Sequence, residues 1–335
     1  MIWRKTWRNE ISLAVRLLRR DGVVALPTET VYGLAASIKS EVALGKIFQI
    51  KGRPLLDPLI VHLLDYNWIS KYAYIDGLRV NIKVLTDAFW PGPLTIILQK
   101  KPMIPAIVTA GLDFVALRCP AHEIFRKVLK YINVPLAAPS ANPFGCLSPT
   151  TAKHVQDSLG DKIPLIIDGG ACSVGVESTI LDVTSDIPCI LRPGAISASD
   201  IAQALKVPVL DHSPSTSSAV APGQLKQHYS PNTRLILAET AEDLSLLVKN
   251  AFLSQTTEKA AFVYLKRPHD LYCANDIFWL SNKGDYFEVA KSLFDMLQNL
   301  DKAEYDVIYC QKAEQKGIGI AINDRLTRAA AKFAN

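Results

Sequence analysis

Residues 22–35 read GVVALPTETVYGLA and set the character of the first half of the chain. The apolar run predicts a buried strand, which ends at Pro27 because proline has no N–H to donate to a sheet. The hydroxyls of Thr28 and Thr30 follow directly and precede a glycine turn. Polar groups at the end of a strand are typical of ligand sites in α/β sheets. The same residues would equally suit a turn in which the threonine hydroxyls cap a helix.

Helices and strands alternate around this segment. Periodic apolar residues predict helices over residues 11–20, 41–51 and 122–131. Short apolar runs predict strands over residues 94–98, 115–117, 165–168, 178–182 and 187–191. Loops dense in glycine and proline join them, so the sequence predicts an α/β or α+β unit built on a large sheet.

A second unit follows a stretch rich in serine and proline. Strands are predicted over residues 234–237, 260–265, 277–280 and 305–309, and helices over 241–252, 286–301 and from Ile320 onward. This regular alternation predicts a small Rossmann-like, three-layer parallel sheet that lacks the GxGxxG motif of a dinucleotide site. A chain of 335 residues exceeds the usual size of one core, so we expect units at 1–205 and 233–335 and a linker at 206–232.

Composition narrows the class of protein. Hydrophobic residues make up 49% of the chain and charged residues 21%, the balance of a globular protein. The sequence holds no apolar run as long as a membrane span, and its charged first ten residues do not read as a secretory signal. The six cysteines show no zinc-like spacing, so we expect reduced thiols and a cytoplasmic location. Residues 1–232 carry a net charge of +6 and residues 233–335 a net charge of −1, which suits a nucleotide or RNA ligand in the first part but also fits an ordinary surface.

Basic side chains stand at the ends of predicted elements. Lys51 and Arg53 flank a glycine in KGRP, and Arg118 and Arg192 end two predicted strands. Taken singly, each fits a solvated helix end or a structural salt bridge. Taken together with the hydroxyl-bearing loops, four cations on one sheet predict a multiply charged ligand such as a triphosphate, held by positioning and charge neutralisation.

These motifs, in their order along the chain, resemble the threonylcarbamoyl-AMP synthase family with the YrdC-like fold, in its longer two-domain form. The matching stretches of the first unit are PTETVYGLA (27–35), KGRP (51–54), PLIVH (58–62), FWPGPLT (89–95), APSAN (138–142), SPT (148–150), VGVEST (174–179) and LRPG (191–194). The blocks APGQLKQHYSP (221–231) and GIGIAINDRL (317–326) resemble the signatures of the linker and the second domain.

The resemblance implies a twisted mixed-sheet domain with a concave pocket, joined to a small Rossmann-like domain. It also implies an L-threonylcarbamoyladenylate synthase, which converts ATP, L-threonine and bicarbonate (or CO₂) into threonylcarbamoyl-AMP, pyrophosphate and, from bicarbonate, water. Mg²⁺ would accompany ATP without direct protein ligands. The product would pass to a tRNA threonylcarbamoyl transferase, with weak contact to tRNA. No covalent nucleophile is required, which agrees with the absence of GxSxG and Ser-His-Asp patterns.

The resemblance also implies residue roles. The threonine-binding positions would be Thr30, His62, Arg118, Ala138 and Ser178. The ATP-binding positions would be Lys51, Arg53, Asp57, Phe114, Ser140, Asn142, Ser148, Arg192, His228 and Tyr229, and Lys51, Arg53 and Arg192 would be catalytic. Asp57 stands where asparagine is common in the family, and Phe114 where threonine is common, so both nucleotide contacts are expected to differ. The linker motif would close over the nucleotide and exclude water.

Two other functions fit part of the sequence. A non-catalytic module that binds double-stranded RNA or tRNA would use the same basic surface, but it needs neither the pocket hydroxyls nor the linker motif. A hydrogenase-maturation or carbamoyltransferase-like module shares the fold. Such modules lie in much larger chains with zinc-finger and acylphosphatase segments, which this sequence lacks.

Overall fold

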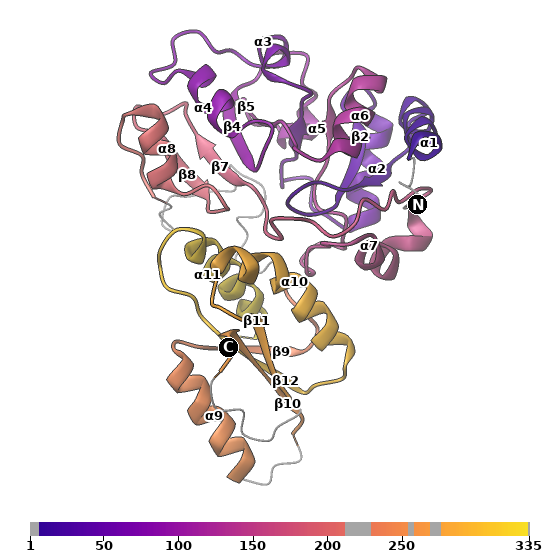
Figure 1. The fold of residues 1–335 in the computed structure, drawn as a ribbon. Coiled ribbons are helices and arrows are strands. Elements are labelled where there is room, and N and C mark those ends of the chain that lie inside the picture. Colours follow the sequence, from indigo (N-terminus) through magenta and orange to yellow (C-terminus); the bar gives the residue numbers. More distant parts are fainter. Residues whose placement is uncertain (1–6, 212–228, 254–257, 269–275, 334–335) are drawn as a thin grey trace, which may run out of the picture.

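The computed structural model describes residues 7–211, 229–253, 258–268 and 276–333 (Figure 1). The strands of the first unit are β1 (Val24–Leu26), β2 (Gly33–Ser37), β3 (Ile60–His62), β4 (Leu94–Gln99), β5 (Phe114–Arg118), β6 (Leu136–Ala137), β7 (Thr179–Asp182) and β8 (Cys189–Arg192). Its α-helices are α1 (Arg8–Arg19), α2 (Glu41–Lys51), α3 (Ile69–Tyr72), α4 (Ile82–Phe89), α5 (Ala106–Thr109), α6 (Glu123–Ile132), α7 (Ala152–Leu159) and α8 (Ala198–Leu205).

The first unit is built on one eight-stranded sheet, in the order β1-β2-β6-β3-β5-β4-β7-β8. The β3–β5 and β4–β7 pairs are parallel, whereas β4–β5 and β7–β8 are antiparallel. The predicted mixed sheet is therefore confirmed. Helix formation follows local signals: Ser40 caps α2 by accepting from the Ala43 N–H, and Gly52 ends it in the left-handed conformation. That ending places the KGRP segment at the start of a loop.

Strand periodicity gives this sheet two different faces. On β5, Val115 and Leu117 point into the main core, whereas Ala116 lies in a small apolar cluster on the opposite face. Arg118 shares that second face, because side chains two residues apart on a strand point the same way. His62 reaches the same face from β3, where it pairs in register with Arg118. The alternation thus places polar residues beyond an apolar patch at the ends of two parallel strands.

The second unit has the predicted three layers. Its strands are β9 (Arg234–Ala238), β10 (Ala260–Lys266), β11 (Ile277–Ser281) and β12 (Val307–Gln311), and its α-helices are α9 (Ala241–Leu253), α10 (Tyr286–Lys302) and α11 (Ile318–Ala330). The strands are parallel, in the order β11-β10-β12-β9. Helices α10 and α11 pack on one face and α9 on the other. The Rossmann-like expectation is confirmed.

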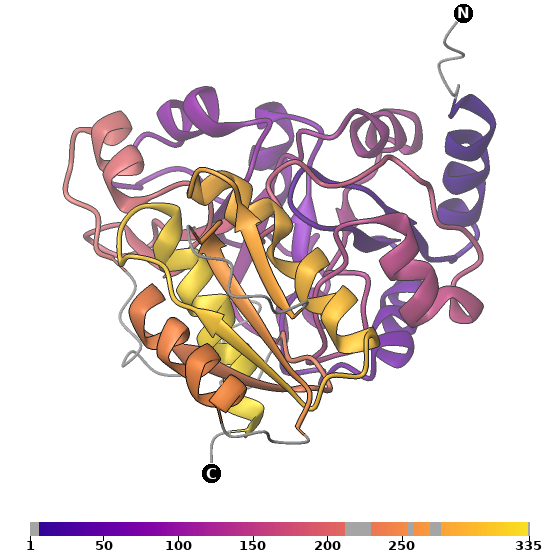
Figure 2. The same cartoon turned by 60° about the horizontal axis from the view of Figure 1, so that its bottom comes forward.

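The two units share a hydrophobic core. Val31, Leu147 and Val176 of the first unit belong to the same cluster as the buried residues of α10 and α11. Figures 1 and 2 show these two helices between the four-stranded sheet and the first unit. Gly175 permits the close approach: its φ is +85°, and a Cβ there would lie 2.4 Å from the Ala290 carbonyl oxygen. The interface therefore requires glycine at this point of VGVEST.

The structure departs from the predicted elements in a few places. Residues 165–168 do not form the expected strand: Ile166 makes only an isolated bridge to Ala25, because β1 is three residues long and offers little ladder to pair with. At the end of the first unit, the backbone of Leu210 exchanges hydrogen bonds of 2.8 and 3.0 Å with Pro188 and Ile190. Ordered pairing thus continues past the expected boundary at residue 205, and residues 212–228 of the linker lie outside the described part.

Within the described ranges, no helix is both long enough and apolar enough to cross a membrane.

Candidate active site

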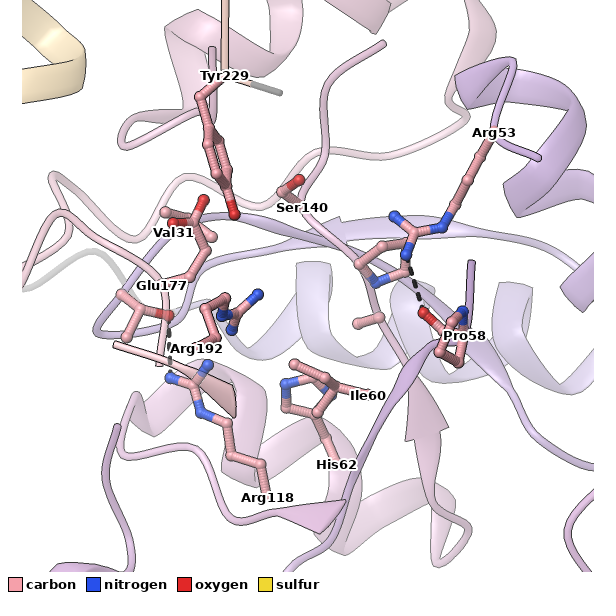
Figure 3. Close-up of a pocket in the computed structure, with 13 residues that line it drawn as sticks. Val31, Arg53, Pro58, Ile60, His62, Arg118, Ser140, Glu177, Arg192 and Tyr229 are labelled. Carbon is pink, nitrogen blue, oxygen red and sulfur yellow. Dashed lines mark hydrogen bonds between the residues drawn. The ribbon is translucent and has the colours of Figure 1, made fainter. Parts of the chain in front are cut away.

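One pocket, with about 480 Å³ of empty volume, gathers the residues that the sequence singled out (Figure 3). Its lining consists of Thr30, Val31, Arg53, Pro58, Ile60, His62, Arg118, Ala138, Pro139, Ser140, Glu177, Arg192 and Tyr229. Figure 3 shows Arg118 and His62 rising from one side, Tyr229 entering from the opposite side, and Arg53 at a third. Sheet strands therefore supply the floor, and loops and the linker end supply the walls.

Arg118 and His62 form the floor at the ends of β5 and β3. Arg118 Nη2 donates to Glu29 Oε1 at 2.7 Å and to Thr30 Oγ1 at 2.9 Å. Its Nε and the Nδ1 of His62 are buried without a hydrogen-bond partner in the described residues. Burial, and after it the charge of Arg118, lowers the pKa of His62 to about 3, so the imidazole is neutral. The floor thus presents one cation and one neutral ring.

Glu29 is a residue that sequence reasoning missed. It is buried, and it accepts from Arg118 and from the Ala121 N–H, the latter at 2.9 Å. Burial alone would raise the pKa of this carboxyl group, but the Arg118 charge and these hydrogen bonds lower it. The signal in the sequence is the position of this carboxylate between the two hydroxyl-bearing residues Thr28 and Thr30. Glu29 balances the floor cation.

Arg53 and Lys51 occupy the wall beyond α2. Arg53 pairs with Asp57 at 2.8 Å and donates to the Pro58 carbonyl at 2.8 Å. Asp57, expected beside the phosphates, therefore acts on the pocket through Arg53 and does not line it. Lys51 is also buried outside the lining, where its Nζ donates to the carbonyls of Ser140 and Asn142, both at 2.6 Å. Burial, helped by the nearby Arg53 charge, holds the Lys51 pKa well below its usual value.

Arg192 and Ser178 meet at the ends of β8 and β7. Arg192 Nη2 donates to the Ser178 carbonyl at 3.0 Å and to its Oγ at 3.1 Å. The Ser178 hydroxyl also shares a 2.7 Å hydrogen bond with Thr95 Oγ1 of β4. Arg192 lines the pocket, and Ser178 stands behind it.

The APSAN loop forms the wall beside Thr30. The Leu34 N–H donates to the Pro139 carbonyl and the Ala141 N–H donates to the Tyr32 carbonyl, both at 2.8 Å. Ala138 and Ser140 reach the pocket through this pairing. Asn142 is buried just outside the lining, where its amide donates to the Cys146 carbonyl at 2.8 Å. The two hydroxyl-bearing loops are thus one joined structure.

The remaining predicted residues lie in different surroundings. Tyr229 lines the pocket, and its backbone has a φ of +63°, a left-handed conformation that few residues other than glycine adopt. Ser148 is buried behind the pocket, where its Oγ donates to Glu177 at 2.5 Å. Phe114 stands at the first residue of β5, 37% exposed and outside the pocket lining. His228 lies outside the described residues.

The second unit supports the pocket wall from behind, through a contact to the lining residue Glu177 that sequence reasoning did not anticipate. Glu177 accepts from Arg325 Nε of α11 at 2.7 Å. Burial would raise the pKa of Glu177, but the charges of Arg325 and Arg192 and the bond from Ser148 lower it. Arg325 lies in the GIGIAINDRL block, so a signal for it was present in the sequence, but its partner is 148 residues away.

Among the described residues, no group of three or more His, Cys, Asp or Glu side chains could hold a metal ion.

Two protein-family models match the chain. One, described as "Telomere recombination", matches residues 16–194, and the other, described as "Threonylcarbamoyl-AMP synthase, C-terminal domain", matches residues 196–331.

Individual relatives match over nearly the same length. The threonylcarbamoyl-AMP synthase of Pyrococcus abyssi is 37% identical over 323 residues, which cover 96% of this chain and 94% of that one. The synthase of Bacillus subtilis is 37% identical over 326 residues, covering 96% and 93%. A solved structure described as P. abyssi Sua5 complexed with L-threonine superimposes with a TM-score of 0.86 at 36% identity, covering 96% of this chain and 94% of that one.

Proposed function

Because the chain belongs to the threonylcarbamoyl-AMP synthase family, we propose that it condenses L-threonine, bicarbonate or CO₂, and ATP into threonylcarbamoyl-AMP and pyrophosphate, with water also released when bicarbonate is the carbon source. The observation that carries this proposal is the convergence of three buried arginines, Arg53, Arg118 and Arg192, on one pocket. So much buried positive charge suits a ligand set with several anionic groups, which an amino-acid carboxylate beside a triphosphate provides.

We assign the threonine half of the pocket to the floor formed by β3 and β5. The partnerless Nε of Arg118 is a donor that a ligand carboxylate would satisfy, and a buried donor without an acceptor is costly. His62, neutral at this position, can exchange a hydrogen bond with the threonine hydroxyl or amine without adding a second cation. Thr30 and Ala138 line the same pocket, and Ser178, which stands behind Arg192, would act on the threonine indirectly. The P. abyssi structure with L-threonine supports the same choice of ligand.

We assign the ATP half to the wall that holds Arg53, Ser140, Arg192 and Tyr229. Arg53 and Arg192 would neutralise the phosphates, with Asp57 fixing the orientation of Arg53. Lys51 would act on the same half from behind the wall by holding the APSAN loop, since its ammonium already donates to two carbonyls of that loop. Asn142 and Ser148 would shape the wall, and the contributions expected of Phe114 and His228 stay predictions.

Mg²⁺ would enter with ATP and supply charge neutralisation on the phosphates. Glu177 lines the pocket and Glu29 lies behind Arg118, and these two carboxylates already accept hydrogen bonds from Arg325 and Arg118. We therefore expect phosphate oxygens and water to hold the ion, and this donor set fits a metal that arrives on the nucleotide.

The proposed chemistry requires positioning and needs no enzyme nucleophile. The threonine amine adds to CO₂ and loses a proton to give a carbamate. A carbamate oxygen then bonds to the α-phosphorus of ATP while the bond from that phosphorus to the pyrophosphate oxygen breaks. Arg118 would hold the carboxylate so that the carbamate faces the α-phosphate, and Arg53 and Arg192 would neutralise the charge of the departing pyrophosphate.

The product, threonylcarbamoyl-AMP, is a reactive mixed anhydride, so a second enzyme must transfer its threonylcarbamoyl group to an acceptor. We expect a tRNA threonylcarbamoyl transferase in the cytoplasm to take it, with only weak contact between this chain and tRNA. An RNA-binding module without catalysis would have no use for buried arginines around a pocket lined by thirteen residues.

Isotope labelling tests the proposal. The protein would be incubated with ATP, Mg²⁺, L-threonine and ¹³C-bicarbonate, and the adenylates would be separated and weighed by mass spectrometry. The expected product is threonylcarbamoyl-AMP one mass unit heavier than that formed from unlabelled bicarbonate. AMP without the threonylcarbamoyl group, or no turnover while RNA binds tightly, would contradict it.

A further inference from the structure

Arg325 is a fully buried arginine at the interface between the two units. Helix α11 carries it beside Ile322 and Leu326, which face the core of the second unit, so packing of the helix directs Arg325 toward the first unit. Nε donates to Glu177 at 2.7 Å, Nη2 donates to the Pro193 carbonyl at 3.0 Å, and Nη1 donates to Asp324 at 2.5 Å. A buried charge with this many partners is held in one orientation.

The partners of Arg325 belong to the wall of the pocket. Glu177 lines it, and Pro193 directly follows the pocket residue Arg192. The guanidinium carbon also lies 5.1 Å from the ring centroid of Tyr229, which covers the pocket from the linker side. A single side chain of the second unit thus touches three segments of the ATP half.

Of the three hydrogen-bond partners of Arg325, Glu177 is the one that can affect the charge offered to the ligand. Its two oxygens accept separately, one from Arg325 and one from the Ser148 hydroxyl. Figure 3 shows Glu177 and Arg192 on the same side of the pocket. If the Arg325 charge were removed, the buried carboxylate would turn to Arg192, the cation that the ATP half offers to the phosphates.

We propose that Arg325 is a positioning residue of the active site, which holds the Glu177 carboxylate away from Arg192 and supports Tyr229 over the pocket, so that the second unit completes the ATP half. This inference rests on the proposed function for the identity of the ligand. It gives the second unit a specific task in the synthesis of the adenylate.

Melting temperatures and the separate use of ATP and threonine distinguish a positioning role of Arg325 from a purely structural one. If Arg325 only joined the two units, its loss would lower the melting temperature and weaken threonine and ATP use together. In the positioning role, ATP use falls more than threonine use, and removing the Glu177 charge as well relieves the competition for Arg192.

The test uses the full chain with Arg325→Gln, Arg325→Lys and the double variant Arg325→Gln with Glu177→Gln. Arg328→Gln is the matched control, because Arg328 lies one turn later on α11 and also pairs with Asp324, at 2.9 Å. ATP affinity is measured by calorimetric titration with Mg²⁺ and L-threonine present, and KM values for ATP and threonine come from pyrophosphate release. Melting curves accompany both.

We expect Arg325→Gln to weaken ATP binding by about tenfold or more, because Arg192 is then shared with Glu177, while the threonine KM changes by about threefold or less. Arg325→Lys keeps the charge without the planar fork and should fall between wild type and Arg325→Gln. The double variant should regain most of the lost ATP affinity, and Arg328→Gln should match wild type.

Equal losses for threonine and ATP, a double variant no better than Arg325→Gln, or unchanged ATP affinity in Arg325→Gln would each overturn the inference. If Arg325→Gln does not fold, Arg325→Lys is judged by the same ATP-to-threonine comparison. The calorimetric titration tests the inference even if the wild-type protein forms no adenylate, a result that would refute the proposed function alone.

Discussion

Replacing Arg118 with lysine separates its charge from its geometry. The Glu29 carboxylate accepts from Arg118 Nη2 at 2.7 Å, and a lysine ammonium can take over that pairing because it needs a single direction only. The partnerless Nε has no counterpart in lysine. Arg118→Lys should therefore keep the buried ion pair and lose the donor that we assign to the threonine carboxylate.

The size of the effect follows from that one donor. A hydrogen bond to a charged group contributes about 1.5–3 kcal/mol, which corresponds to a rise in the threonine KM of roughly tenfold to 200-fold. The ATP KM should change by about threefold or less, since Arg53 and Arg192 are untouched.

The assay is the initial rate of pyrophosphate release at varied threonine and saturating ATP, together with a melting curve. A melting temperature close to wild type would show that the Glu29 pairing survives. An unchanged threonine KM in a folded Arg118→Lys protein would refute the assignment of Arg118 to the threonine carboxylate. A rise confined to the ATP KM would also refute it.

Three further substitutions test the account. Glu29→Gln leaves Arg118 without its buried partner and should lower the free energy of unfolding by about 3–5 kcal/mol in urea titrations, whereas a loss near zero would contradict the buried pair. The folded-state pKa of His62, about 3, lies below its unfolded value, so wild type loses stability as pH falls below 6.5. His62→Gln should remove up to about 1.4 kcal/mol per pH unit of that slope, and parallel curves for the two proteins would exclude a buried neutral His62. Gly175→Ala would bring a Cβ to 2.4 Å from the Ala290 carbonyl at a φ of +85°, and should destabilise the chain by roughly 1–3 kcal/mol in the same titrations; wild-type stability would contradict the tight interface.

Long periodic segments were predictable from the sequence, and short ones were not. Helix α2 begins and ends where the pattern predicts, because a serine cap and a left-handed glycine bound its apolar residues. Residues 165–168 have the apolar pattern of a strand, yet only Ile166 forms a bridge to β1. Strand pairing depends on what lies beside the segment, and the sequence alone did not show that β1 offers only three residues.

The cations of the site were predictable, and the groups that balance them were not. Arg118 and Arg192 stand out because each ends an apolar strand, and Arg53 because it follows the glycine that ends a helix; the structure brings all three to one pocket. Their positions show nothing of which carboxylates neutralise them. Glu29 lies 89 residues from its partner Arg118, and such long-range pairs are visible only in the folded chain.

The central claim is that this pocket joins threonine to ATP, and threonine-dependent release of pyrophosphate tests it most directly. Purified protein would be mixed with ATP, Mg²⁺ and bicarbonate, and pyrophosphate would be followed with and without L-threonine. The account predicts release only when threonine is present, and a much smaller response to L-serine, which lacks the methyl group that the apolar side of the pocket would contact. Release that is independent of threonine, or no release from protein that binds both ligands, would contradict it.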